Sequence, residues 1–225
     1  MHEAQASKDA GIGAAPRVRL VLASRSARRR LLLTEAGIEH EAIDPSVDDG
    51  ELSPGEVGPE AWVAALAWLK ARAGAEAIGE ADEGVLVLGA DTVCVIEDSG
   101  STRIIGQPRD EAHAAEMIDG MQSREHGVLT GVAICGRTDN DAFVRTVFVD
   151  RATVRIGEIG RERIARYVDS GGWRGKAGGY NLTERLAEGW PIEFEGDPGA
   201  IVGLPMRRLV PLLDRLGVAA RKGAS

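Results

Sequence analysis

Strand-like and helical segments alternate along most of this chain, and that alternation constrains its fold more than any other feature. Short apolar runs typical of buried strands are followed by stretches whose apolar residues recur at helical spacing. We expect strands over 18–21, 41–43, 85–88, 103–105, 128–136 and 143–155, and helices over 27–36, 59–78, 110–121, 161–170 and from 204 onward. The pattern predicts an α/β protein.

The first strand leads into a serine-containing turn and an arginine-rich helix start. Ser26 is the expected N-cap, which places Arg28 and Arg29 in the first helical turn. Cations are unfavourable at that end because the helix dipole already places partial positive charge there. We therefore interpret the turn as a phosphate site, in which a bound anion offsets the repulsion. The alternative is a solvated helix start in an arginine-rich protein.

Composition favours one large domain. The chain has 225 residues, of which 44% are hydrophobic, enough to build a sizeable core. We expect a single domain over 18–218, a disordered Ala/Gly-rich leader over 1–17 and a flexible tail over 219–225.

Charge and cysteine usage narrow the range of partners. The net charge of −8 argues against nucleic acid or an anionic membrane as the main partner, and every apolar run is shorter than a membrane span requires. Cys94 and Cys135 each lie in an apolar run with no second cysteine nearby. They are expected to be buried, reduced thiols of a cytoplasmic protein.

Lysine is rare, with four lysines among 27 Lys and Arg residues. Lys8 and Lys222 lie near the ends, which leaves Lys70 and Lys176 in the body of the chain. An ammonium group is a compact point charge that suits phosphate. The glycines around Lys176 would also let a ligand approach the backbone closely. We interpret both lysines as phosphate-binding; chance survival in an arginine-biased composition is the alternative.

Lys70 lies in the helix expected over 59–78. Trp62, Leu66, Leu69 and Ala73 recur there at helical spacing. We expect these four side chains to form the face that packs against the sheet.

Carboxylates form a second candidate site. Asp91 is expected just past the end of an apolar strand, where open α/β sheets place ligand-binding groups. With Thr92 beside it, such a carboxylate can hold Mg²⁺ or orient a water molecule. The acidic loop after Val47, with Asp48, Asp49 and Glu51, could join Asp91 as ligands of a hard cation that bridges phosphate oxygens. A turn-forming aspartate and a solvated acidic loop are the alternatives.

Familiar nucleotide-binding signatures are missing from the sequence. It contains no Walker A loop, no nucleophile elbow and no Gly-x-Gly-x-x-Gly opening a helix. Scattered cations, carboxylates and glycine turns remain, and these suit phosphoryl transfer by positioning and charge neutralisation.

Eight short motifs follow one another along the chain. They are Leu22-Ala-Ser-Arg-Ser-x-Arg-Arg, Val47-Asp-Asp, Leu66-Ala-x-x-Lys-Ala71, Gly89-Ala-Asp-Thr, Gly106-Gln-Pro108, His126 to Thr130-Gly-Val-Ala133, Lys176-Ala-Gly-Gly-Tyr180 and Val202-Gly-Leu-Pro205. Each motif is weak alone, but the ordered series over 18–213 resembles the Maf (septum formation inhibitor-like) family.

The resemblance implies a two-lobed α/β fold, with a mixed, twisted sheet, flanking helices and a central cleft between the lobes. It implies a nucleoside triphosphate pyrophosphatase that uses Mg²⁺ or Mn²⁺ and yields a nucleoside monophosphate and pyrophosphate. It also implies a cytoplasmic protein, often a homodimer, linked to cell-division arrest and to the removal of modified nucleotides.

Site residues carry over from the family by motif position. The resemblance implies that Asp91 is the proton acceptor. The residues that match the phosphate side are Lys70, Ser24, Ser26, Arg29 and Lys176. The residues that match positions tuning base choice are Arg28, Thr92 and Thr183.

The chain departs from the family pattern at three places. The acidic pair usually written Asp-Glu is Asp48-Asp49, and the Gly-Lys-Pro turn carries Gln107 in place of lysine. Thr183 stands where a glutamine is usual, and its single hydroxyl offers less than an amide can. Arg28 and Thr92 resemble the dTTP/UTP branch, so we expect a preference for these nucleotides.

Two functions are consistent with the sequence. The first is a metal-dependent pyrophosphatase of nucleoside triphosphates, used in nucleotide-pool cleansing and cell-division control. The second is a nucleotide-binding regulator of septation with little or no turnover, since Gln107 removes a cation and Asp49 shortens a carboxylate. The presence of both Asp91 and Lys70 favours the enzyme.

Overall fold

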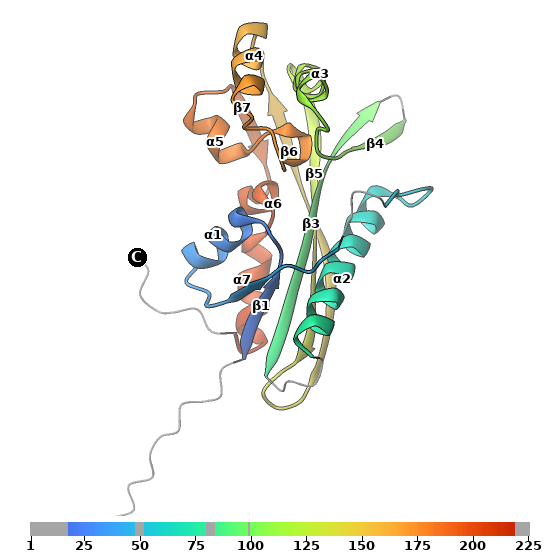
Figure 1. Cartoon of the computed structure of the whole chain (residues 1–225), viewed down its shortest axis with the longest axis vertical. Helices are drawn as coiled ribbons and strands as arrows, with labels where there is room; N and C mark the ends of the chain where they lie inside the picture. The colour runs from blue at the N-terminus through green and yellow to red at the C-terminus, as the bar shows by residue number, and fades with distance from the viewer. Residues whose placement is uncertain (1–17, 48–51, 80–83, 99, 219–225) are drawn as a thin grey trace, which may run out of the picture.

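The computed structural model describes residues 18–47, 52–79, 84–98 and 100–218 (Figure 1). The leader and tail expected at the two ends, and the acidic residues Asp49 and Glu51, lie outside the described residues. Within these residues no helix is both long and apolar enough to cross a membrane.

The described strands form one seven-stranded mixed sheet, so the predicted α/β class is confirmed. The strands are β1 (Arg19–Ala23), β2 (Glu41–Ile43), β3 (Val85–Asp98), β4 (Ser101–Ile105), β5 (Arg124–Arg137), β6 (Phe143–Ile156) and β7 (Ile192–Glu195). Their order is β2-β1-β3-β5-β6-β7, with β4 also paired to β3. β1 runs parallel to β2 and β3, and every other pairing is antiparallel.

Helices cover both faces of this sheet. They are α1 (Ala27–Glu35), α2 (Pro59–Ile78), α3 (Glu111–Met121), α4 (Arg161–Asp169), α5 (Leu182–Ala187), α6 (Pro198–Val202) and α7 (Met206–Arg215), with a 3₁₀ turn η1 (Ala177–Gly179). In Figure 1, α2 lies on one side of β3, and α1 and α7 lie on the other. The sequence did not predict α5, α6 or β7, which are too short to show a clear period.

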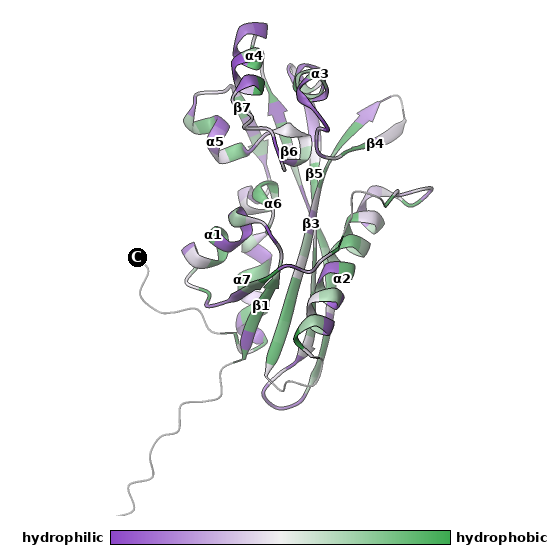
Figure 2. Cartoon of the chain, viewed as in Figure 1, coloured by the Kyte–Doolittle hydropathy of each residue, from purple (hydrophilic) through white to green (hydrophobic). Residues whose placement is uncertain are grey.

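Separate hydrophobic clusters define two lobes, with α3, α4 and α5 in one and α1, α2 and α7 in the other (Figure 1). Alternation along β3 assigns its side chains to the two faces of the sheet. Leu86 and Leu88 pack with Leu209 of α7, whereas Val87 packs with Ala71 of α2. Figure 2 shows the resulting hydrophobic residues along β1 and β3, between the helices.

β3 does not end at Leu88, as the sequence analysis expected, but continues to Asp98. Asp91 therefore lies in the middle of a strand, where it is the register partner of Gly131 on β5. The reason is that apolar residues resume directly after it and β5 pairs alongside as far as Val95. The polar Gly-Ala-Asp-Thr stretch interrupts the hydrophobic pattern but not the ladder.

One edge of β3 opens at this level. β1 pairs with residues 85–89 and β4 with residues 94–98 on that edge. Residues 90–93, between them, have a ladder partner only in β5 among the described strands. Asp91 is thus beyond the carboxyl end of β1, although its own strand runs on. Open parallel sheets bind ligands beyond the carboxyl ends of their strands. Asp91 has such a position because β1, the parallel neighbour of β3, ends just before this level.

α2 approaches the sheet through glycines. A Cβ added at Gly89 would lie 2.4 Å from the Ala67 carbonyl oxygen, and one at Gly131 would lie 2.4 Å from that of Val63. The predicted buried face of α2 was wrong in part, because Leu69 is 41% exposed whereas Val63, Ala67 and Ala71 are fully buried. Close backbone contact selects small residues, so the packing face is not the most hydrophobic one.

Candidate active site

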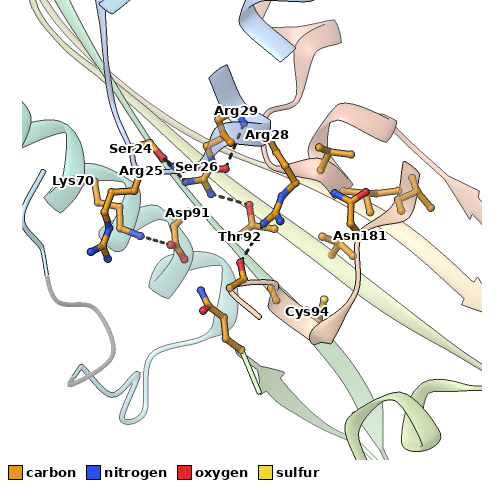
Figure 3. A pocket seen from close by; sticks show the side chains of 18 of the residues that line it. Ser24, Arg25, Ser26, Arg28, Arg29, Lys70, Asp91, Thr92, Cys94 and Asn181 are labelled. Atoms are coloured by element: carbon orange, nitrogen blue, oxygen red, sulfur yellow. Dashed lines mark hydrogen bonds and ion pairs between the residues drawn. The ribbon is translucent and has the colours of Figure 1, made fainter. Parts of the chain in front are cut away.

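A cleft of about 430 Å³ lies where β1 ends and the edge of β3 opens (Figure 3). Its walls come from the β1–α1 turn, α2, the middle of β3, the segment around η1 and the end of α6. The two ends of the cleft differ in chemistry. One carries charged groups and hydroxyls, and the other is largely apolar.

An ion pair occupies the charged end. Lys70 Nζ of α2 donates to Asp91 Oδ1 of β3 at 2.6 Å, and the two side chains are 12% and 11% exposed. Asp91 shares the α2-facing side of β3 with Val87 and Gly89, and the close approach at Gly89 brings Lys70 within reach. A carboxylate so placed can accept a proton from water, and the ammonium can offset negative charge on a phosphate.

The serine turn is held together by its own hydrogen bonds. Ser26 caps α1 by accepting from the Arg29 N–H at 3.4 Å, as predicted. The Ser24 Oγ accepts from the Ser26 N–H and from Arg29 Nη1, each at 3.2 Å. Ser24, Ser26 and Arg29 therefore all line the cleft with fixed positions. These donors at a helix start suit an anion.

Arg29 also ties the turn to two other elements. Its Nε donates to the Gly203 carbonyl at 3.0 Å and its Nη2 donates to Thr92 Oγ1 at 3.2 Å. The Thr130 hydroxyl donates to the Ala200 carbonyl at 2.7 Å, so the Thr92 hydroxyl must be the donor in its 2.9 Å bond to Thr130. The one hydroxyl proton of Thr92 is therefore used inside the protein.

Arg28 reaches across the cleft mouth. Its Nη2 donates to the Gly175 carbonyl at 3.2 Å. Burial lowers the pKa of the Arg28 guanidinium from its ordinary value, and the nearby Glu184 carboxylate opposes that shift. Arg28 therefore links α1 of one lobe to the glycine-rich segment of the other.

The apolar end includes residues that the sequence analysis did not place in the site. They are Cys94, Val128, Tyr180, Asn181, Leu182, Ile201 and Val202. The Tyr180 hydroxyl is 2.8 Å from His126 Nε2, and burial raises the pKa of both Tyr180 and Cys94, the latter to about 12. Cys94 and Cys135 are buried, as predicted. The sequence signals for this end were three of the family motifs, those that contain Val128, Tyr180 and Val202.

His126 gives the stability of this end a defined pH dependence. Burial lowers the pKa of His126 from 6.5 to about 4. Between these values the unfolded chain binds a proton that the folded chain does not, so acid favours unfolding. We expect this one group to reduce the free energy of unfolding by about 3 kcal/mol as the pH falls from 6.5 to 4, with no change above pH 7.

Urea denaturation of the unaltered protein and of His126→Gln across pH 4.5–7.5 measures this effect. The variant should lose the part of the pH dependence that belongs to His126, whatever its overall stability. Parallel curves for the two proteins would contradict the prediction.

Comparison with known proteins identifies the family. The profile of the Maf-like protein family matches residues 19–216. The chain belongs to the Maf family. A dTTP/UTP pyrophosphatase of Alkalilimnicola ehrlichii is 36% identical over 204 residues, which cover 90% of this chain and 95% of that protein. One of Maricaulis maris is 37% identical over 212 residues, or 93% and 95% of the two chains.

Among solved structures, the Staphylococcus aureus Ham1 protein aligns with 61% of this Maf chain and 71% of its own. The sequence identity is 18% and the TM-score is 0.37, a likeness too weak to define a shared fold.

The structure brings most of the Maf motif residues together. Those that line the cleft are Ser24, Ser26, Arg28, Arg29, Lys70, Asp91, Thr92 and Gln107. Gln107 comes from the loop after β4, and its side chain is exposed. These residues come from four separate stretches of sequence, so their meeting could be expected from the family resemblance but not from any local pattern.

Two of the predicted site residues that the structure describes do not line the cleft. Lys176 is 8% exposed and forms an ion pair with Glu184 of α5. Thr183 is exposed, and its hydroxyl donates to Asn181 Oδ1 at 2.8 Å. The reason is that residues 182–187 form α5, whose first turn is capped by Asn181 and turns Thr183 outward.

The donor set fits a hard divalent cation. Among the described residues no three His, Cys, Asp or Glu side chains cluster as a metal cage, and Asp91 is the carboxylate that lines the cleft. Mg²⁺ is commonly held by one or two carboxylates together with substrate phosphates and water. Asp91 supplies one such carboxylate in the Maf cleft, and Asp49 and Glu51 lie outside the described residues.

Proposed function

We propose that this Maf protein hydrolyses nucleoside triphosphates to a nucleoside monophosphate and pyrophosphate, with UTP and dTTP preferred. The Lys70–Asp91 pair at 2.6 Å in the charged end of the cleft is the observation that carries the proposal. The relatives named dTTP/UTP pyrophosphatase support the choice of reaction and of base.

The reaction needs few protein groups. Asp91 accepts a proton as the oxygen of a water molecule bonds to the α-phosphorus. The bond from that phosphorus to the oxygen bridging the α and β phosphates breaks, and pyrophosphate leaves with the electron pair. Lys70 and the donors of the serine turn hold the phosphate oxygens and offset their charge. Arg29 fixes the turn in the position that this requires.

Divalent metal completes the proposal. Asp91 would hold Mg²⁺ or Mn²⁺, with Asp49 and Glu51 proposed as further ligands. When bound, the cation supplies charge neutralisation on the phosphate oxygens.

Pyrophosphate release from a panel of nucleoside triphosphates tests the reaction and its metal requirement. Activity is expected with Mg²⁺ or Mn²⁺ and is expected to fall to background in EDTA, with recovery when the cation is returned in excess. Activity that persists in EDTA would contradict metal dependence. Tight nucleotide binding without release of pyrophosphate would instead favour the septation regulator.

Lys70→Ala should weaken the binding of every nucleoside triphosphate by a similar factor. The lost charge-assisted contact is worth about 1.5–3 kcal/mol, so we expect KM to rise or kcat/KM to fall about 10- to 100-fold. Steady-state kinetics with UTP, dTTP, CTP and ATP make the comparison. A variant that reorders the preference among bases would place Lys70 beside the base instead.

Membership in the Maf family also leads us to propose a cytoplasmic homodimer that acts in nucleotide-pool cleansing and cell-division control. We propose no nucleic-acid or membrane partner, consistent with the net charge of −8. Sedimentation equilibrium of the full chain tests the dimer.

A further inference from the structure

The cleft orients a nucleotide by the difference between its two ends. Lys70, Asp91 and Ser24 lie together at one end in Figure 3. Leu182 and Val202 belong to the hydrophobic cluster that forms the apolar end. Phosphates bind at the charged end, so the base occupies the apolar one. In Figure 3, Lys70 and Asn181 lie at opposite sides of the cleft. Asn181 therefore meets the edge of the base farthest from the sugar.

Asn181 is a buried polar side chain at that end, with 5% of its surface exposed. Its Oδ1 accepts from the Glu184 N–H at 3.0 Å and from the Thr183 hydroxyl at 2.8 Å, which caps α5. Rotating the amide by half a turn would set its NH₂ against the Glu184 N–H, which cannot accept. The cap therefore fixes the orientation of the amide, with Oδ1 toward α5 and Nδ2 away from it.

The amide nitrogen is left as a donor toward the cleft. Figure 3 shows the nitrogen of Asn181 on the side of the cleft where Arg28 lies. Within the part of the chain that the structure describes, this Nδ2 makes no hydrogen bond. The side chain as a whole is buried, but this nitrogen is not among the fully buried atoms that lack a partner, so it remains accessible from the cleft that Asn181 lines. A donor in that position favours a ligand that brings an acceptor.

We infer that Asn181 selects the base: its capped amide donates to the carbonyl oxygen at position 4 of uracil or thymine and rejects the amino group of cytosine. This inference rests on the proposed function and names the group that would set its base preference. Cytosine would place an N–H donor against the Asn181 donor, which leaves both groups unpaired. The same amide would also donate to guanine O6, so Asn181 discriminates oxo from amino groups. The preference for pyrimidine bases over purine bases would then depend on other contacts.

The inference moves base selection from Thr183 to a residue two positions earlier. Thr183 is exposed, and its hydroxyl donates to the capping oxygen of Asn181. The Thr92 hydroxyl donates its proton to Thr130. Asn181 is the lining residue of the apolar end that offers a side-chain amide. Its donor role follows from its part in the cap of α5.

Two substitutions separate the donor from the cap. Asn181→Asp keeps an oxygen for the cap and turns the cleft-facing donor into an acceptor. Asn181→Ser keeps a good N-cap and removes the donor. Calorimetric titration with non-hydrolysable α,β-methylene UTP and CTP gives the ratio of the two dissociation constants. The unaltered protein is expected to bind the UTP analogue about 10-fold or more tightly than the CTP analogue.

The ratio is expected to approach one in Asn181→Ser and to invert in Asn181→Asp, where the carboxylate accepts from the cytosine amino group. Asn140→Asp, on the turn between β5 and β6, makes the same change in charge away from the cleft lining and should leave the ratio unchanged. Thermal melts confirm that each variant is folded.

The outcomes are distinct for the two proposals. An unaltered protein that does not distinguish the analogues, or variants that keep its ratio, would overturn the role of Asn181. An unaltered protein that selects the UTP analogue through Asn181 but releases no pyrophosphate from UTP would contradict the enzyme and support the base contact.

Discussion

Asp91→Asn is expected to lower kcat about 10²-fold or more, the range for loss of a general base. Asparagine has nearly the same shape and can still accept from Lys70, so nucleotide affinity should change much less. The amide cannot take a proton from the attacking water. Pyrophosphate release at saturating UTP with Mg²⁺ measures kcat, and titration with a non-hydrolysable analogue measures affinity.

Asp98→Asn is the matched control. Asp98 is on the same strand but at its exposed end, where it pairs with Arg124 at 3.7 Å. That substitution should leave kcat unchanged within about twofold, because surface pairs of this kind contribute little. A near-normal kcat in Asp91→Asn would remove Asp91 from the chemistry.

Gly131→Ala is expected to destabilise the protein strongly. The added Cβ would lie 2.4 Å from the Val63 carbonyl oxygen of α2, and 2.7 Å from the carbon of the same group. Helix and strand must separate, since both contacts are backbone. Overpacking of this kind costs about 1–3 kcal/mol and more where rigid groups collide. Because α2 also carries Lys70, the variant should lose activity as well.

Urea denaturation and kcat measured on the same samples check this result. Gly120→Ala in α3 is the control, because an added Cβ meets nothing within 4 Å there. It should be neutral or stabilise by up to about 1 kcal/mol, as alanine favours the helix. Equal stabilities of the two variants would contradict the proposed close approach of α2.

The regular elements of the fold could be predicted because their signals are local. The α/β class, the cap at Ser26 and the two buried cysteines were confirmed. The length of β3 and the packing face of α2 could not be predicted from hydrophobicity. Both depend on neighbours far along the sequence. β5 pairs with β3 past Asp91, and the absence of a side chain at Gly89 lets the face of α2 with Ala67 and Ala71 pack against β3.

The charged end of the site was more predictable than the apolar end. Lys70 and Asp91 stood out by residue type in the sequence, and the structure places them 2.6 Å apart. Asn181 did not stand out, because its role depends on a six-residue helix, α5, that has no period to detect. Motif position assigned Thr183 to base choice, but the same helix leaves Thr183 exposed and outside the cleft lining.

Two strands cross the whole molecule without interruption. β3 and β5 stay paired from Val85–Arg137 to Val95–Gly127, through the level of the cleft and into both lobes. Moving one lobe relative to the other would deform that ladder, so we expect the two walls of the cleft to be largely preorganised. Little of the binding free energy is then needed to close the protein around a nucleotide. Differences in contact between nucleotides therefore translate directly into differences in affinity.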